Sequence, residues 1–392
     1  MSIFHRTELA KELTSLILHD SPILASSPGL FLAARRRTGK STFLTSDLQP
    51  ELERQGAVVL HADLWGNRFT DPADVITKVI RAAIEPYNSA MLRLARSAGL
   101  EKVSVAGFSF ALDQIGADDG VSISDALAAL SDDCQRKIVL ILDEAQQCIT
   151  TERGNNTLFA LKAARDRLNL RHHGLRVVAT GSSRDKLSML CDAHSQAFFG
   201  APMMDFPTLD RDYVAWVCRQ LPPVLAADVD EVMALFQRTG CRPEWLGAAA
   251  KVVHARPELS APELKALFTQ AVESRIQTRN HGLLKVVRTL RPLQSVVLRV
   301  LVTQGHDYAP YMPATMTLYR TVLDHIGAAS DLPIDEDGVQ ATLDSLKDLG
   351  LLWRSAHGVY ALEESGLREL LEDCGLTSIP EVPSERRLLA EA

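Results

Sequence analysis

The sequence lacks long apolar runs, paired cysteines and an excess of positive charge. No stretch approaches the roughly 20 apolar residues that a membrane-spanning helix needs, and the N-terminus, MSIFHRTELAKEL, becomes charged too early for a secretory signal. The six cysteines are scattered without a C-x-x-C pair, so we expect free thiols in a reducing cytoplasm and neither a disulfide frame nor a zinc site. A net charge of −7 gives no general reason to expect a nucleic-acid partner.

A loop of arginines and small residues follows the first predicted strand. The apolar stretch GLFLAA, residues 29–34, predicts a short buried strand, and residues 40–56 predict a helix that ends at Gly56. The segment between them, RRRTGK, brings a glycine and a lysine to the start of the helix. This arrangement is typical of a phosphate-binding loop, because a helix N-terminus offers unpaired N–H groups and a positive dipole end to an anion. The alternative is a chance match on a strand–helix turn.

The side chains of this loop fit ATP and Mg²⁺. Lys40 would reach the β- and γ-phosphates, and the Ser41 hydroxyl would ligate Mg²⁺. Backbone N–H groups would wrap the β-phosphate. Ala34 stands where the first glycine of such a loop is expected, and alanine is tolerable there while φ stays negative. The predicted nucleotide-binding residues of the loop are Arg36, Arg37, Thr38, Gly39, Lys40, Ser41 and Thr42.

Acidic and small polar residues end two further predicted strands. KIVLILDEAQQ, residues 137–147, is a continuous apolar run closed by Asp143 and Glu144, as expected for a strand buried on both faces of a parallel sheet. Asp143 would hold Mg²⁺ through water, and Glu144 would polarise the water that attacks the γ-phosphate. The alternative is an ordinary strand that ends in a solvated acidic turn.

The strand predicted from LRVVATGSSRDKL, residues 175–187, ends beside these acids. Ser182 or Ser183 would hydrogen-bond the γ-phosphate or the attacking water, and Arg184 would add positive charge. The alternative for Arg184 is a surface salt bridge.

Taken in order, the motifs RRRTGKST, VVLHADLW, ILDEAQQ and ATGSSR resemble those of the archaeal-type P-loop ATPases. This group belongs to the ASCE division and lies between the AAA+ and STAND ATPases. FHRTELAKEL, residues 4–13, resembles the family's opening segment, whose backbone holds adenine and which here contains Arg6. RTGCRPEWLGAAAKVV, residues 238–253, resembles the start of its lid helix, and the resemblance places Pro243 near the base and ribose. Positions His5, Ala34 and Cys241 carry glycine in the family.

The C-terminal part has the pattern of a winged helix. Residues 291–305, 315–327 and 335–352 predict three helices, and residues 351–362 predict two strands that turn at His357 and Gly358. The region from residue 281 onward carries ten lysines and arginines against sixteen aspartates and glutamates. Because positive charge dominates affinity for the DNA backbone, the acidic third helix disfavours DNA as its partner.

These observations predict an α/β P-loop NTPase core with helices on both faces of a parallel sheet, followed by a helical lid and a winged-helix domain. The predicted bounds are 1–208 for the core, 209–280 for the lid, 281–375 for the winged helix and 376–392 for a disordered tail. Residues 95–130 predict an additional hairpin.

The predicted function is that of an Mg²⁺-dependent ATPase, slow or stimulated by a partner, that acts as a cytoplasmic switch. The predicted catalytic residues are Glu144, Lys40, Arg184 and Ser182, and the predicted metal ligands are Ser41 and Asp143. We expect a protein partner or self-association and no membrane. The alternative is a DNA-binding or DNA-loading protein that uses its winged helix.

Overall fold

The computed structural model divides the chain into two compact units, Met1–Trp216 and Val217–Ala392. The structure describes residues 3–19, 29–34, 37–66, 69–87, 89–90, 93, 115–116, 120–182, 184–192, 194–225, 227–354, 360–363 and 366–377. Among these residues, no helix is both long and apolar enough to cross a bilayer. The predicted hairpin falls largely, and the predicted tail almost entirely, outside the described residues.

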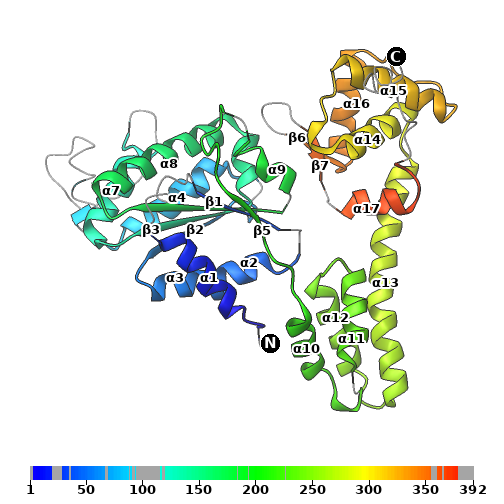
Figure 1. The fold of residues 1–392 in the computed structure, drawn as a ribbon, viewed down its shortest axis with the longest axis horizontal. Helices are drawn as coiled ribbons and strands as arrows, with labels where there is room; N and C mark the ends of the chain where they lie inside the picture. Colours follow the sequence, from blue (N-terminus) through cyan, green and yellow to red (C-terminus); the bar gives the residue numbers. More distant parts are fainter. Residues whose placement is uncertain are drawn as a thin grey trace, which may run out of the picture. The chain divides into compact units, whose positions relative to one another are not determined.

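The first unit is built on a five-stranded sheet in the order β2-β3-β4-β1-β5 (Figure 1). Every pair of neighbouring strands in it is parallel. Its strands are β1 (Leu30–Ala33), β2 (Val58–Asp63), β3 (Ile138–Asp143), β4 (Leu175–Gly181) and β5 (Met203–Asp205). The short edge strand β5 had no recognisable signal in the sequence.

Helices cover both faces of this sheet, which is why its central strands are apolar along their whole length. Every residue of β3 is buried. Because neither face of the strand meets solvent, the run IVLIL is apolar at every position. Figure 1 shows α1, α2 and α3 on one face and α4, α7 and α8 on the other. The helices of this unit are α1 (Thr7–Leu18), α2 (Lys40–Phe43), α3 (Gln49–Arg54), α4 (Pro72–Ile84), α7 (Ile123–Cys134), α8 (Glu152–Arg171), α9 (Arg184–Ser188) and α10 (Arg211–Gln220), whose end belongs to the second unit.

The strand order separates the predicted phosphate loop from the predicted acids by one strand. The loop follows β1 and the acids end β3, while β4 lies between these two strands. All strands are parallel, so their carboxyl ends meet at one edge of the sheet. The end of β4 therefore lies between the loop and the acids.

The segment predicted as one helix, residues 40–56, is helical but is not a continuous α-helix. A π-helical turn, η1 (Leu44–Leu48), joins α2 to α3. Such turns are rare and occur often near functional sites. Within η1 the buried Asp47 accepts hydrogen bonds from the backbone N–H of Arg6 at 3.2 Å and pairs with Nδ1 of His5 at 2.6 Å. This turn therefore connects the N-terminal segment to the helix that follows the loop.

The second unit begins as a helical bundle. Its helices α11 (Val229–Arg238) and α12 (Pro243–His254) pack against the first part of the long α13 (Ala261–Arg288). α13 buries Leu264, Phe268 and Val272, whose three- and four-residue spacing places them on one helical face. The same helix runs through residue 280, so the boundary predicted there lies inside a helix.

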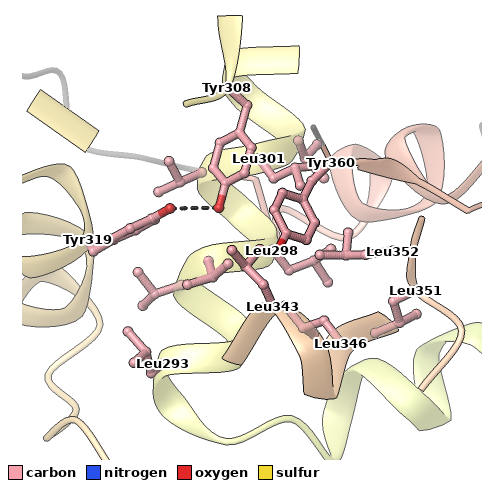
Figure 2. Close-up of a cluster of buried hydrophobic side chains, with 14 of the residues drawn as sticks. Leu293, Leu298, Leu301, Tyr308, Tyr319, Leu343, Leu346, Leu351, Leu352 and Tyr360 are labelled. Carbon is pink, nitrogen blue, oxygen red and sulfur yellow. Dashed lines mark hydrogen bonds between the residues drawn. The ribbon is translucent and has the colours of Figure 1, made fainter. Parts of the chain in front are cut away.

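The end of the chain has the predicted order of helix, helix, helix and hairpin. Its elements are α14 (Pro292–Gln304), α15 (Pro313–His325), α16 (Glu336–Asp348), β6 (Leu352–Arg354), β7 (Tyr360–Leu362) and α17 (Gly366–Asp373). Elsewhere along the chain and after α14, short 3₁₀ turns lie at Ala145–Thr150 (η2), Pro223–Leu225 (η3) and Gly305–Asp307 (η4). β6 and β7 pair antiparallel. Figure 2 shows the buried core that these helices and the β6–β7 hairpin share, in which the hydroxyls of Tyr308 and Tyr319 lie 2.6 Å apart. The predicted fold class of a parallel-sheet core followed by a helical region is confirmed, and the order of the C-terminal elements is that predicted for a winged helix.

Candidate nucleotide-binding site

The loop between β1 and α2 has the backbone of an anion-binding turn. Gly39 has a φ of +89° immediately before α2, and Arg37 has a φ of +65°. A side chain at Gly39 would meet only ordinary contact, 3.7 Å from Cδ1 of Leu209, so the left-handed backbone, and not lack of space, favours glycine there. Lys40 is the first residue of α2 and is 6% exposed. The loop thus brings a cationic side chain and a helix N-terminus to the same point.

Alanine in place of the first loop glycine is accommodated. Ala34 is buried and its N–H donates to the carbonyl of Gly181 at 2.9 Å, which continues the pairing of β1 with β4. Its φ is not positive, so a Cβ adds no backbone strain.

Lys40 lies at the centre of a cluster of polar side chains from three elements. Its ammonium donates to Oδ1 of Asp143, to Oε1 of Glu144 at 3.0 Å and to Oγ1 of Thr180 at 3.1 Å. Ser41 donates to Oδ2 of Asp143 at 2.8 Å. The structure therefore brings together Lys40, Ser41, Asp143 and Glu144, four of the residues predicted to act on phosphate and metal.

Glu144 occupies the turn after β3 in a left-handed conformation, with a φ of +59° and a ψ of +45°. Non-glycine residues adopt this conformation at a cost of about 1–2 kcal/mol. The carboxylate is held by several donors: Oε2 accepts from Oγ of Ser182 at 2.7 Å, from the N–H of Ser182 at 3.2 Å and from Nε2 of Gln146 at 2.6 Å. The strained turn and these contacts together direct the carboxylate toward Lys40.

Both acids are ionised in this environment. Burial acts to raise the pKa of Asp143, but the Lys40 ammonium and the hydrogen bonds from Thr180 and Ser41 outweigh it, so the pKa lies below its usual value. Burial likewise opposes ionisation of Glu144, and Lys40, Ser182 and Gln146 lower its pKa overall. Two carboxylates against one ammonium leave the cluster with an excess negative charge.

Three residues near this cluster were not predicted from the sequence. Thr180 donates to Oδ1 of Asp143 at 2.5 Å, because it lies one position beyond the paired residues Leu142 and Ala179 on the neighbouring strands. Gln146 lies in the turn η2 that follows Glu144. His61, on β2, is close enough to Asp143 for their charges to interact, and burial lowers its pKa. The sequence offered a signal for all three, since each belongs to a motif already singled out: ATGSSR, ILDEAQQ and VVLHADLW.

Other predicted residues lie nearby or elsewhere. Thr38 is buried in the loop and Thr42 is exposed on α2. Ser182 contacts Glu144, as given above. Pro243 is the first residue of α12, in the second unit. Arg36, Ser183 and the side chain of Arg184 lie outside the described parts of the chain, although Arg184 begins α9.

Arg6 fixes the opening segment to the chain that follows β5. Its guanidinium donates to the carbonyl of Pro207 at 2.7 Å and, more weakly, to that of Thr208 at 3.4 Å, and it lies 5.0 Å from the ring centroid of Phe206. Burial lowers the pKa of this group, although Asp210 and Asp47 act in the opposite sense. The predicted role of this segment at adenine stays a prediction.

The donor set at Ser41 and Asp143 fits Mg²⁺. A hydroxyl and a carboxylate are hard oxygen ligands, and Mg²⁺ is usually held by one or two carboxylates together with substrate phosphates. In the described part of the chain, no group of three or more His, Cys, Asp or Glu residues forms a metal site. A protein cage for the ion is therefore not found there, whereas a site completed by phosphates is compatible with these two ligands.

No family model and no curated protein matches the sequence. Among solved structures, the Walker-type ATPase PABY2304 of Pyrococcus abyssi is similar over 94% of this chain and 96% of its own, with 18% sequence identity and a TM-score of 0.53. The ORC2 protein of Aeropyrum pernix in its ADP form matches 96% of both chains, with 16% identity and a TM-score of 0.53. Similarity at this level of identity establishes the fold. The chain therefore has the fold of the archaeal-type AAA+ P-loop ATPases, as its motifs predicted.

Proposed function

We propose that this protein binds and hydrolyses ATP with Mg²⁺ and acts as a nucleotide-driven switch. The observation that carries the proposal is the convergence of Lys40, Ser41, Asp143 and Glu144 at the carboxyl edge of the sheet, beside the positive-φ turn at Gly39. The similar structure solved in an ADP form supports an adenine nucleotide as the ligand.

The residues of the cluster divide between phosphate binding and water activation. The N-terminus of α2 and Lys40 would bind the phosphates, while Ser41 and Asp143 would hold Mg²⁺, which supplies positive charge to the phosphate oxygens when bound. Water attacks the γ-phosphorus in line, the bond to the bridging oxygen breaks and ADP leaves. Glu144 orients this water and accepts its proton, as its ionised carboxylate allows. Arg184 and Ser182 are proposed to stabilise the γ-phosphate, and Pro243 and Arg6 to lie near the base.

The partner that the switch engages is proposed to be a protein, including a second copy of this chain. Two half-buried polar residues of α16, Gln340 and Asp344, are tied to their own domain, which supports this choice over DNA. Gln340 accepts from the Tyr311 hydroxyl and donates to Asp344 at 2.8 Å. Arg354 lies 3.6 Å from Asp344, with its guanidinium 5.4 Å from the ring centroid of Tyr360.

The test of nucleotide binding is Lys40→Ala, compared with Lys11→Ala. Lys11 is an exposed lysine that pairs with Glu8 within α1, so it controls for the loss of one lysine. Removing the ammonium at the phosphates should abolish measurable MgATP binding by calorimetry, while Lys11→Ala should bind as the wild type does. Unchanged affinity in folded Lys40→Ala protein would reject the site.

The test of turnover is Glu144→Gln, which keeps the shape of the side chain and removes the base. ATP should remain bound while hydrolysis falls by roughly 10²–10⁴-fold, the usual contribution of a positioned general base. Wild-type turnover in this variant would show that Glu144 is not the base. A wild-type protein that binds ATP but does not turn it over, alone or with a partner, would limit the function to a binding switch.

A further inference from the structure

The two oxygens of Glu144 have different surroundings. Oε2 accepts three hydrogen bonds, two from Ser182 and one from Gln146. Among the described residues, Oε1 accepts from Lys40 alone, at 3.0 Å. One oxygen is thus held by Ser182 and Gln146, and the other is held by the lysine that phosphate would attract.

Gln146 is positioned for this contact by its surroundings. Its side chain is fully buried, and Nε2 lies 2.6 Å from Oε2 of Glu144. Its Oε1 is buried with no hydrogen-bond partner among the described residues, which costs about 1–3 kcal/mol of desolvation, so the hydrogen bond from Nε2 to Glu144 is the contact that orients the carboxamide. Gly181 leaves the necessary space, because a Cβ there would come within 2.7 Å of Oε1 of Gln146.

We propose that Gln146 is a positioning residue that fixes the orientation of Glu144 and leaves Oε1 as the oxygen that takes the proton from water. Lys40 donates to Oε1, and bound ATP would release this oxygen by drawing the ammonium to the phosphates. This inference rests on the proposed hydrolysis of ATP. Gln146 was not among the residues predicted from the sequence. Under this proposal, Oε1 of Glu144 becomes able to accept a proton only when ATP is bound.

Once Lys40 has moved, only the contacts of Oε2 keep the carboxylate of Glu144 in place. A carboxylate with one free oxygen rotates unless the other oxygen is held from more than one direction. Ser182 donates from the end of β4, and Gln146 donates from the turn η2, so the two donors come from different elements. Without Gln146, Ser182 alone would hold Oε2, and the aim of Oε1 toward the water would be lost.

The test is Gln146→Met in the full-length protein, which keeps an unbranched buried side chain and removes the amide donor. Its matched control is Gln147→Met, the same change at a half-buried neighbour in η2. We expect kcat to fall by up to about 100-fold in Gln146→Met, the scale of a 1 Å misplacement, with KM and MgATP affinity unchanged. Gln147→Met should change neither kcat nor KM.

A second measurement needs no turnover. A double-mutant cycle on the unfolding free energy of the nucleotide-free protein, with Gln146→Met, Glu144→Ala and both, should show that Gln146→Met costs more when Glu144 is present. Additive effects would overturn the contact. Coupling with unchanged kcat would overturn the positioning role. A wild-type protein without ATPase activity would reject the proposed hydrolysis and with it this role, while the cycle would still decide whether the contact exists.

Discussion

At the scale of single residues, the site depends on one buried lysine. Lys40 is 6% exposed and Asp143 is 2% exposed, so water screens their attraction little. Removing one partner of a buried ion pair is costly because the other charge remains buried. Here two carboxylates depend on the same ammonium. The cluster is therefore a source of stability whose loss should depend on pH.

Lys40→Met should destabilise the protein more at pH 7 than at pH 5. In the wild type the pKa of Asp143 and of Glu144 is lowered, so their contribution to the unfolding free energy is full above about pH 4 and is lost below it. Without the ammonium, burial raises both values above those of the unfolded chain, so the stability of the variant rises as pH falls. Urea unfolding should give a cost of roughly 3–5 kcal/mol at pH 7.

The control for this prediction is Lys11→Met, which removes an exposed lysine from a pair on one helix. Exposed pairs contribute little, so its cost should be small and nearly equal at both pH values. An equal cost of Lys40→Met at pH 5 and pH 7 would show that the two carboxylates do not depend on Lys40.

At the scale of elements, the turn from α11 to α12 places a cysteine, Cys241, at a position with positive φ, where glycine is favoured. Gly240 and Cys241 both have positive φ, +69° and +56°. A cysteine in this conformation is strained by about 1–2 kcal/mol. Glycine would relieve that strain but would gain more freedom in the unfolded chain, which costs roughly 0.5–1 kcal/mol. The relief of strain is expected to exceed the entropy cost slightly, so glycine at position 241 should give a somewhat larger unfolding free energy.

Cys241→Gly should therefore raise the unfolding free energy by up to about 1 kcal/mol, measured by chemical denaturation. Cys218→Gly is the matched control, because Cys218 lies inside α10 and glycine in a helix interior destabilises by about 1 kcal/mol. The two substitutions should have opposite signs. Destabilisation by both would mean that contacts of the Cys241 side chain outweigh the strain of its backbone.

At the scale of the whole molecule, the negative charge is concentrated in the C-terminal region. The chain carries −7 in total, and from residue 281 onward sixteen acids oppose ten basic residues. On α16 the exposed acids include Asp337 and Asp348. A helix of this charge would repel a phosphate backbone, since DNA affinity depends on neutralising phosphates with lysine and arginine.

The full-length protein should therefore bind duplex DNA no more tightly than the non-specific range, about 10⁻⁶ M or weaker, at physiological salt. Replacing two acids, in Asp337→Lys with Asp348→Lys, should strengthen residual binding without increasing ATPase activity. A salt titration by fluorescence anisotropy measures both proteins. Wild-type affinity below micromolar, with a steep salt slope, would support the alternative of a DNA-loading protein.

The sequence by itself determined the local elements and the chemistry of their ends. A buried strand, a turn with Gly39 and a helix that begins with Lys40 follow from apolar runs and turn residues within one short stretch. The acids after β3 follow from a run buried on both sides. These features are local, because hydrophobic periodicity and helix-starting residues act within a few positions. The predicted fold class could be inferred from their order along the chain.

Only the tertiary structure decided which side chains meet. The placement of β4 between β1 and β3 brings Thr180 to Asp143 and Ser182 to Glu144, and no local pattern specifies that pairing of distant strands. The contact of Gln146 with one particular oxygen of Glu144 further requires a left-handed φ at Glu144 and a missing side chain at Gly181. Strand order and hydrogen-bond geometry depend on packing between distant segments, whereas strand, turn and helix signals act within neighbouring residues.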